Sequence, residues 1–84
     1  MLIIKTQQEA DALIKDGVLN IKDDVTFECD IRINADITAW DITAGDIDAY
    51  AFVIAYELFK CKSVKFRRKN GFAKCLDSEI IYKK

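Results

Sequence analysis

Three tandem copies of a five-residue unit, Asp-Ile-x-Ala-x, fill residues 36–50 without interruption. A period of five fits neither an α-helix, which repeats about every 3.6 residues, nor a flat strand, which repeats about every two. The chain must therefore turn once in every unit. Because Ile and Ala lie two positions apart, a short extended segment directs both to the same side. Identical units tend to adopt identical local structure and to stack, so the repeat predicts a solenoid.

The simplest structure for these units is a parallel β-helix with one unit on each face. Ile and Ala would face a narrow core, and each Asp would lie at a bend, where a short acceptor side chain can bond backbone amides. Four faces of five residues would give a coil of about twenty residues, the size of known β-solenoids. Phe52 would then take the isoleucine position that follows Ile47. The six-residue step from Ile31 to Ile37 predicts a bulge or a wider corner near Asn34.

The units resemble those of the pentapeptide-repeat family, in which a bulky aliphatic residue occupies the centre of each unit and a small residue stands two positions before it. Here Ala mostly follows Ile by two positions, and only Ala35 before Ile37 has the usual order. The chain is also similar to a bacterial family in which Asp-Ile-x-Ala-Trp and Asp-Ile-x-Ala-Gly units precede Cys-Lys-Ser-Val and Cys-Leu-Asp segments, which are residues 61–64 and 75–77 here. The resemblance implies a right-handed, four-sided β-helix and carries over no functional residues.

Length and composition indicate one small domain. The 84 residues are 51% hydrophobic and 32% charged, which suits a single globular unit with an efficiently used core. We expect a mainly β domain over residues 1–84, in which 1–17 form a strand and a capping helix and 18–84 form the coils of a short right-handed parallel β-helix. No apolar run reaches the length of a membrane span and no signal peptide is recognisable, so we expect a cytoplasmic location without a membrane partner.

The expected helix follows a short apolar segment at the N-terminus. Thr6 and Glu9 form a capping box, apolar residues then recur at helical spacing up to Lys15, and Asp16-Gly17 supplies a stop. A helix this short depends on packing against the rest of the protein. It could cover the open end of the solenoid with its Leu13 face, or it could pack on one flank.

The reactive residue types form no catalytic constellation. Histidine is absent, so the commonest general base near neutral pH is missing. The three cysteines, Cys29, Cys61 and Cys75, are widely spaced among apolar neighbours, which favours buried, reduced thiols over a zinc site. We therefore predict that the protein is not an enzyme and needs no cofactor or metal.

The repeated aspartates at positions 36, 41 and 46 suggest a metal or carboxylate-pair hypothesis. In a β-helix, however, residues five apart lie on successive faces and are dispersed around the coil. Corner capping is therefore the favoured interpretation. Trp40 occupies the variable bend position and is expected to be exposed at a corner, where it either stacks on an aromatic residue of a neighbouring coil or marks an interface.

Charge is segregated along the chain. Residues 1–58 carry four basic and twelve acidic side chains, whereas residues 59–84 carry nine basic and two acidic ones. Because sequence position maps to axial position on a solenoid, the molecule should have an acidic body and a basic end. These charges suit solvated faces and strand-edge gatekeepers. They also suit an association, head-to-tail or two-fold, that matches the two ends.

These observations predict a non-enzymatic structural or protein-interaction module that self-associates, with a dimer as the favoured homo-oligomer, or that binds an unidentified protein partner. The alternative function is nucleic-acid binding by the basic 60–74 segment, in which seven basic residues are interleaved with aromatic ones. The candidate interaction residues are Trp40, Lys65, Arg67, Arg68 and Lys69.

Overall fold

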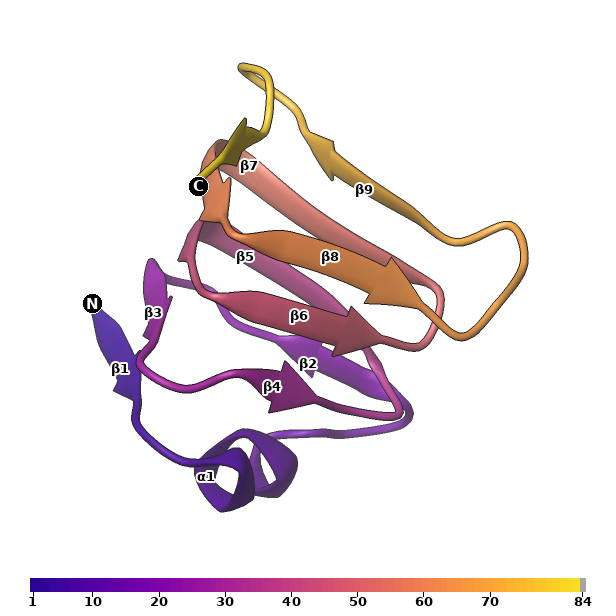
Figure 1. The fold of residues 1–84 in the computed structure, drawn as a ribbon. Coiled ribbons are helices and arrows are strands. Elements are labelled where there is room, and N and C mark those ends of the chain that lie inside the picture. Colours follow the sequence, from indigo (N-terminus) through magenta and orange to yellow (C-terminus); the bar gives the residue numbers. More distant parts are fainter. Residues whose placement is uncertain (84) are drawn as a thin grey trace.

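The computed structural model describes residues 1–83, which form a parallel β-helix of about four turns with a short helix at the N-terminal end (Figure 1). All of the pairings between named strands are parallel, as predicted. The elements in chain order are β1 (Leu2–Ile4), α1 (Gln7–Ala12), β2 (Val18–Asn20), β3 (Val25–Phe27), β4 (Ile31–Arg32), β5 (Asp36–Thr43), β6 (Asp46–Ala49), β7 (Phe52–Cys61), β8 (Ser63–Phe66), β9 (Phe72–Cys75) and β10 (Ile81–Tyr82).

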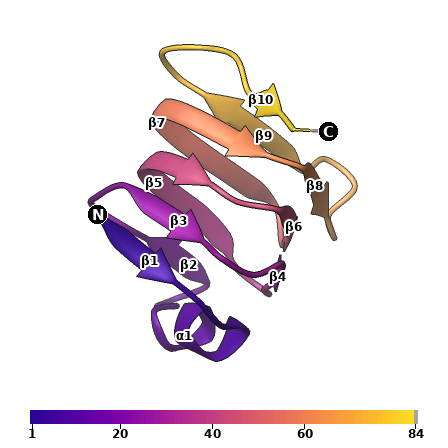
Figure 2. The ribbon, with the colours of Figure 1, turned by 60° about the vertical axis from the view of Figure 1, so that its left-hand side comes forward.

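The coil has three faces, so the predicted four-sided coil is wrong. The long strands β5 and β7 each bend from one face to the next. Face A contains β2, the first halves of β5 and β7, and β9; face B contains β1, β3, the second halves of β5 and β7, and β10. Face C contains β4, β6 and β8. Figure 2 shows the strands of face B side by side, with the strands of face C seen nearly edge-on.

The register between coils gives the coil length. Ile37 pairs with Val53 and Ile42 pairs with Phe59, which are offsets of 16 and 17 residues rather than about twenty. Val53, not Phe52, therefore takes the isoleucine position after Ile47, and Val53 is fully buried. A fourth face would widen the cross-section, and the alanine that each unit contributes is too small to fill it.

The coil is right-handed, as expected. In Figure 1, β6 and β8 run from left to right in front, β5 and β7 return behind them, and the chain climbs from α1 at the bottom to β9 at the top.

The prediction that the isoleucines and alanines of the repeat face the core is also confirmed. The isoleucines and alanines of the three units are buried, and among the described residues no polar side chain joins them in the core.

The helix α1 covers the N-terminal end of the solenoid. It lies between β1 and β2 in the chain, below β4, where a strand of face C would stand in a complete coil (Figure 1). Gln7 extends the cover to the strand edge, because its Oε1 accepts the N–H of Arg32 at 2.8 Å. Ala10 is buried and Ile14 partly buried against the core, whereas Leu13 is exposed. The end-capping prediction is therefore right and the predicted Leu13 face is wrong.

The boundary at residue 18 also differs from the structure. β1 pairs in parallel with β3, so the first coil already begins at Leu2.

The capping box of the helix is formed as predicted, since Thr6 Oγ1 accepts the N–H of Glu9 at 3.2 Å. Asp16 and Gly17 have φ angles of 52° and 75°, and they form the turn after the helix rather than its last residues. No helix among residues 1–83 is long and apolar enough to cross a membrane.

Candidate interaction surfaces

The aspartates of the repeat begin the three faces in turn, at positions 36, 41 and 46. Asp36 Oδ1 accepts the N–H groups of Ala51 and Phe52 in the next coil, at 2.9 and 3.0 Å. Asp46 Oδ1 accepts the hydroxyl of Ser63, also one coil further on, at 2.8 Å. These two side chains tie successive coils together at their corners. The predicted capping of backbone N–H groups is found at Asp36, whereas Asp46 accepts a hydroxyl and Asp41 Oδ1 has no hydrogen-bond partner among residues 1–83. Within residues 1–83 no three cysteine or carboxylate side chains are placed to hold a metal ion.

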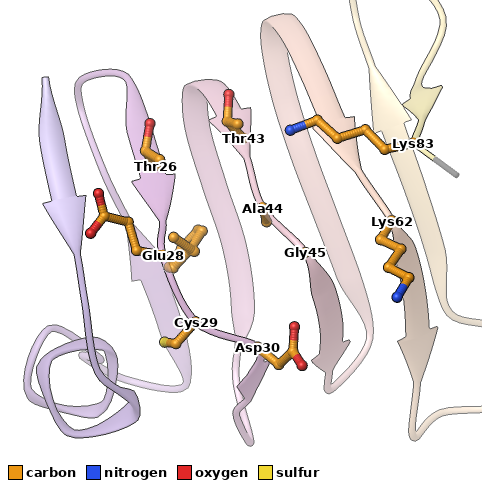
Figure 3. A pocket seen from close by; sticks show the side chains of 10 residues that line it. Thr26, Glu28, Cys29, Asp30, Thr43, Ala44, Gly45, Lys62 and Lys83 are labelled. Atoms are coloured by element: carbon orange, nitrogen blue, oxygen red, sulfur yellow. The ribbon is translucent and has the colours of Figure 1, made fainter.

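A groove of about 660 Å³ runs along the corner between faces B and C (Figure 3). Gly45 lets Asp30 approach the backbone there, because a Cβ at position 45 would lie 2.8 Å from Asp30 Oδ1. The same oxygen accepts the N–H of Asp46 at 3.0 Å, so Asp30 has little freedom to move away. Carboxylates line the groove from the early coils, and Lys62 and Lys83 line it from the later ones. The groove therefore presents both signs of charge.

The groove contains one thiol but no activated nucleophile. Cys29 is half-buried there, and burial, followed by the nearby carboxylates of Asp30 and Glu9, raises the pKa of its thiol. A raised pKa disfavours the thiolate, which is the reactive form. Cys61 and Cys75 are buried, and burial likewise raises the pKa of Cys61. The predicted buried, unbridged thiols are therefore found at Cys61 and Cys75, while Cys29 is only partly covered.

The basic C-terminal segment encircles the coil. Lys60 lies on face B beside Thr43, Lys65 on face C beside Asp48, and Lys74 on face A beside Ile54. Phe59, one of the aromatic residues interleaved with this segment, is fully buried in the core. The seven basic residues thus do not gather on one face with aromatic rings between them. Nucleic-acid binding stays a prediction, and charge reversal at Arg67, Arg68 and Lys69 would test it.

The two arginines of the segment are bound to earlier coils at the corner between faces C and A, Arg67 to a residue two coils back and Arg68 to one in the preceding coil. Arg67 Nη1 donates to Asn34 Oδ1 at 2.9 Å. Arg68 Nη1 donates to the Tyr50 hydroxyl at 3.3 Å, and its guanidinium carbon lies 5.8 Å from the centre of the Tyr50 ring. The hydrogen bond to Tyr50 raises the pKa of Arg68. Lys69 follows at the same corner and is exposed.

Trp40 lies at a different corner, between faces A and B, and 45% of its surface is exposed. Its ring centre is 5.3 Å from that of Tyr56, with an angle of 62° between the rings, which is an edge-to-face contact. Of the two alternatives expected for Trp40, contact with an aromatic residue of a neighbouring coil is therefore found. The register shifts here, because one residue, Trp40, lies opposite two, Tyr56 and Glu57. This is a β-bulge that the sequence did not predict. The wider corner predicted near Asn34 is found as well, because Ile31 and Ile37 lie six residues apart across the bend between β4 and β5, as Ile47 and Val53 do in the next coil.

The bulge opens a cleft of about 390 Å³ beside the aromatic pair. Leu76 and Asp77, which follow β9, line the cleft on the side of the last coil. Sequence reasoning missed every residue of this cleft except Trp40, although Tyr56 is sixteen positions after Trp40, which is one coil length. The lining residues are Trp40, Tyr56, Glu57, Leu76 and Asp77.

At the C-terminal end of the solenoid, no helix or strand among residues 1–83 covers the outer edges of the last strands. β8 is the last strand of face C, and its inward residue Val64 is only half-buried, although its neighbour Ile47 in β6 is 1% exposed. β9 and β10 are the last strands of faces A and B. Ile81 and Tyr82 in β10 are exposed. Within residues 1–83 the two ends thus differ, because the helix α1 lies at the N-terminal end.

Comparisons with known proteins found nothing similar enough to inform these surfaces: no family model matches the chain, and neither does a curated protein or a solved structure.

Proposed function

We propose that the protein is a non-enzymatic interaction module that forms a two-fold dimer through the C-terminal end of its β-helix. The difference between the two ends supports this. α1 covers the first coil, whereas β8, β9 and β10 end the coil without a covering element among the described residues. Unpaired strand edges beside exposed apolar side chains are a template for pairing with another chain.

A second copy is the partner that offers matching edges. In a two-fold dimer the edge strands of the two copies meet in the antiparallel direction, and the contact closes after two copies. Head-to-tail stacking would need a bare strand edge at the N-terminal end, but α1 occupies part of that end.

The charge of the C-terminal end determines how such a dimer responds to salt. Residues 59–84 carry nine basic and two acidic side chains, so two C-terminal ends repel each other. Salt screens charges that are further apart than about 8 Å at physiological ionic strength. Two-fold association should therefore strengthen as salt is added. Head-to-tail association would bring the basic end to the acidic body, and it should weaken instead.

The test is the solution mass by light scattering, from dilute to concentrated protein and at low and high salt. Ile81→Lys places a further positive charge at the C-terminal edge and should convert the dimer to a monomer. Ile3→Lys is the matched control, because Ile3 lies in the same outward row of face B at the opposite end, and the two residues are 39% and 46% exposed. Ile3→Lys should remain dimeric.

Two results would contradict the proposal. One is a monomer at every concentration and salt. The other is a dimer that Ile3→Lys dissociates and Ile81→Lys leaves intact. Circular dichroism of both variants ensures that a change of mass reflects the interface and not unfolding.

A further inference from the structure

We propose that the cleft at the corner between faces A and B binds an organic cation, specifically a methylated ammonium group. Its walls are the rings of Trp40 and Tyr56 together with Leu76, and its charges are the carboxylates of Glu57 and Asp77. Aromatic rings attract cations electrostatically, with Trp the most effective, and methylated ammonium groups are typical ligands of such sites. This inference concerns a different surface from the C-terminal edges and does not depend on the dimer.

The aromatic pair supplies two walls of different orientation. The rings of Trp40 and Tyr56 are 45% and 40% exposed and stand at 62° to each other. A cation beside them can therefore contact both rings at once. Leu76, which is 50% exposed, adds an apolar surface for methyl groups. A methylated ammonium suits this mixture better than a primary ammonium, which is more strongly hydrated and is costly to bring against apolar walls.

The charge of the cleft selects a cation. Two of the five lining residues, Glu57 and Asp77, are acidic and exposed, and none of the five is basic. One oxygen of Asp41, the residue after Trp40, is buried and has no hydrogen-bond partner among residues 1–83. These carboxylates attract a cation and repel an anion.

Backbone hydrogen bonds hold the cleft in place. The N–H of Trp40 donates to the carbonyl of Asp23 at 3.1 Å. On the other side, the N–H of Asp77 donates to the carbonyl of Tyr56 at 3.0 Å, and Ser78 Oγ donates to the carbonyl of Glu57 at 3.1 Å. The bulge and the segment after β9 are thus fixed to neighbouring coils. A preformed site loses less conformational entropy when a ligand binds.

The corner between faces C and A provides an internal comparison. There the guanidinium of Arg68 lies over the Tyr50 ring, so the protein places its own cation against an exposed aromatic side chain. The Trp40 corner has two such rings and two carboxylates, but no lysine or arginine among the residues that line it. It is therefore the corner at which a cation from outside fits.

The experiment uses the fluorescence of Trp40, which is the only tryptophan of the chain and reports on this cleft alone. Choline and a peptide that carries trimethyl-lysine are titrated at constant ionic strength. Both should change the fluorescence in a saturable way. Tighter binding of the peptide would assign the site to a protein side chain, and tighter binding of choline to a small molecule. The neutral analogue of choline, with carbon in place of nitrogen, should bind at least about tenfold more weakly.

Variants locate the binding. Tyr56→Leu keeps an apolar side chain but removes one ring, and Glu57→Gln removes one charge; each should weaken choline binding several-fold. Tyr50→Leu is the matched control, because Tyr50 is exposed to a similar degree, 37% against 40% for Tyr56, at another corner. It should leave the affinity unchanged. Glu57 is exposed, so its variant keeps the test valid if Tyr56→Leu does not fold.

The inference is overturned if neither cation gives a saturable fluorescence change. It is also overturned if the neutral analogue binds as well as choline, or if a folded Tyr56→Leu or Glu57→Gln protein binds choline with the affinity of the unmodified protein.

Discussion

Ile42 and Thr43 are neighbours in β5 with opposite environments. Ile42 is fully buried and stacks between Val25 and Phe59 in the adjacent coils. Thr43 is partly exposed on the outer side of face B, between Thr26 and Lys60. This alternation follows from the strand period of two and could be read from the repeat. It determines which substitutions each position can accept.

We expect Ile42→Asp to destabilise the protein by more than about 4 kcal/mol, since it places a charge without a partner in the core. Thr43→Asp should cost about 1 kcal/mol or less, because its carboxylate reaches water and lies beside Lys60. Urea unfolding of both variants measures the difference. Equal destabilisation would refute the inward and outward assignment.

At the residue scale, the sequence did not predict which side chains of neighbouring coils contact one another. Trp40 was predicted to be exposed at a corner, and it is. Its partner Tyr56 lies sixteen residues further on, in the next coil. Leu76 lies twenty residues after Tyr56, because β9 pairs with β7 at that offset. A period of five supplies neither offset until the number of faces and the corner lengths are known. The five candidate interaction residues are also not brought together, since Trp40 and Arg67 lie at different corners.

At the scale of elements, the corners determine how strands succeed one another. The corner at residues 50–51 is one residue longer than the corners inside the repeat, so the inward position moves from Phe52 to Val53. Asp36 stabilises this corner from the coil below by accepting two backbone N–H groups. Phe52 faces outward instead and stacks on Phe72, with 5.9 Å between the ring centres.

Asp36→Ala should destabilise the protein by about 1–3 kcal/mol, because it leaves two partly buried N–H groups of the next corner without their acceptor. Asp46→Ala is the control, since it removes a hydrogen bond to a hydroxyl that can turn toward water, and it should cost less. Thermal unfolding compares the two. A larger loss in Asp46→Ala would show that the Asp36 cap is not what holds the corner.

The start of the N-terminal helix is determined by residues close together in the sequence, whereas its end and its buried face are not. Thr6 and Glu9 form the capping box that the sequence indicates, so the start of α1 was predictable. Its end and its buried face were not, because they depend on the edge of β4 that the helix covers. Gln7 binds the N–H of Arg32 in that edge, and Ala10 rather than Leu13 enters the core.

At the scale of the whole molecule, folding buries the thiol of Cys61 and partly covers that of Cys29. Burial raises the pKa of Cys61, and of Cys29, above the ordinary value of 9.0. The folded protein then retains these protons to higher pH than the unfolded chain does. Their contribution to stability is complete below about pH 9 and is lost as the pH rises through the folded pKa.

We therefore expect the melting temperature to fall as the pH increases above about 9, and to fall less steeply in Cys61→Ala. The two proteins differ only at residue 61, so the difference between their curves isolates the buried thiol. Parallel curves for the two proteins would refute this assignment. Because Cys61→Ala also leaves a cavity, the comparison uses the slope with pH and not the absolute melting temperature.

The sequence by itself determined the parallel β-helix, its inward isoleucines and alanines, the start of the capping helix, and the axial separation of charge. Each follows from interactions between residues close together in the chain. Tertiary structure alone decided the three faces, the bulge beside Trp40, the ring-like spread of the basic residues, and the cleft with its two carboxylates. These depend on how corner lengths add up around a coil and on how tightly its interior must be filled, so residues sixteen or seventeen positions apart become neighbours.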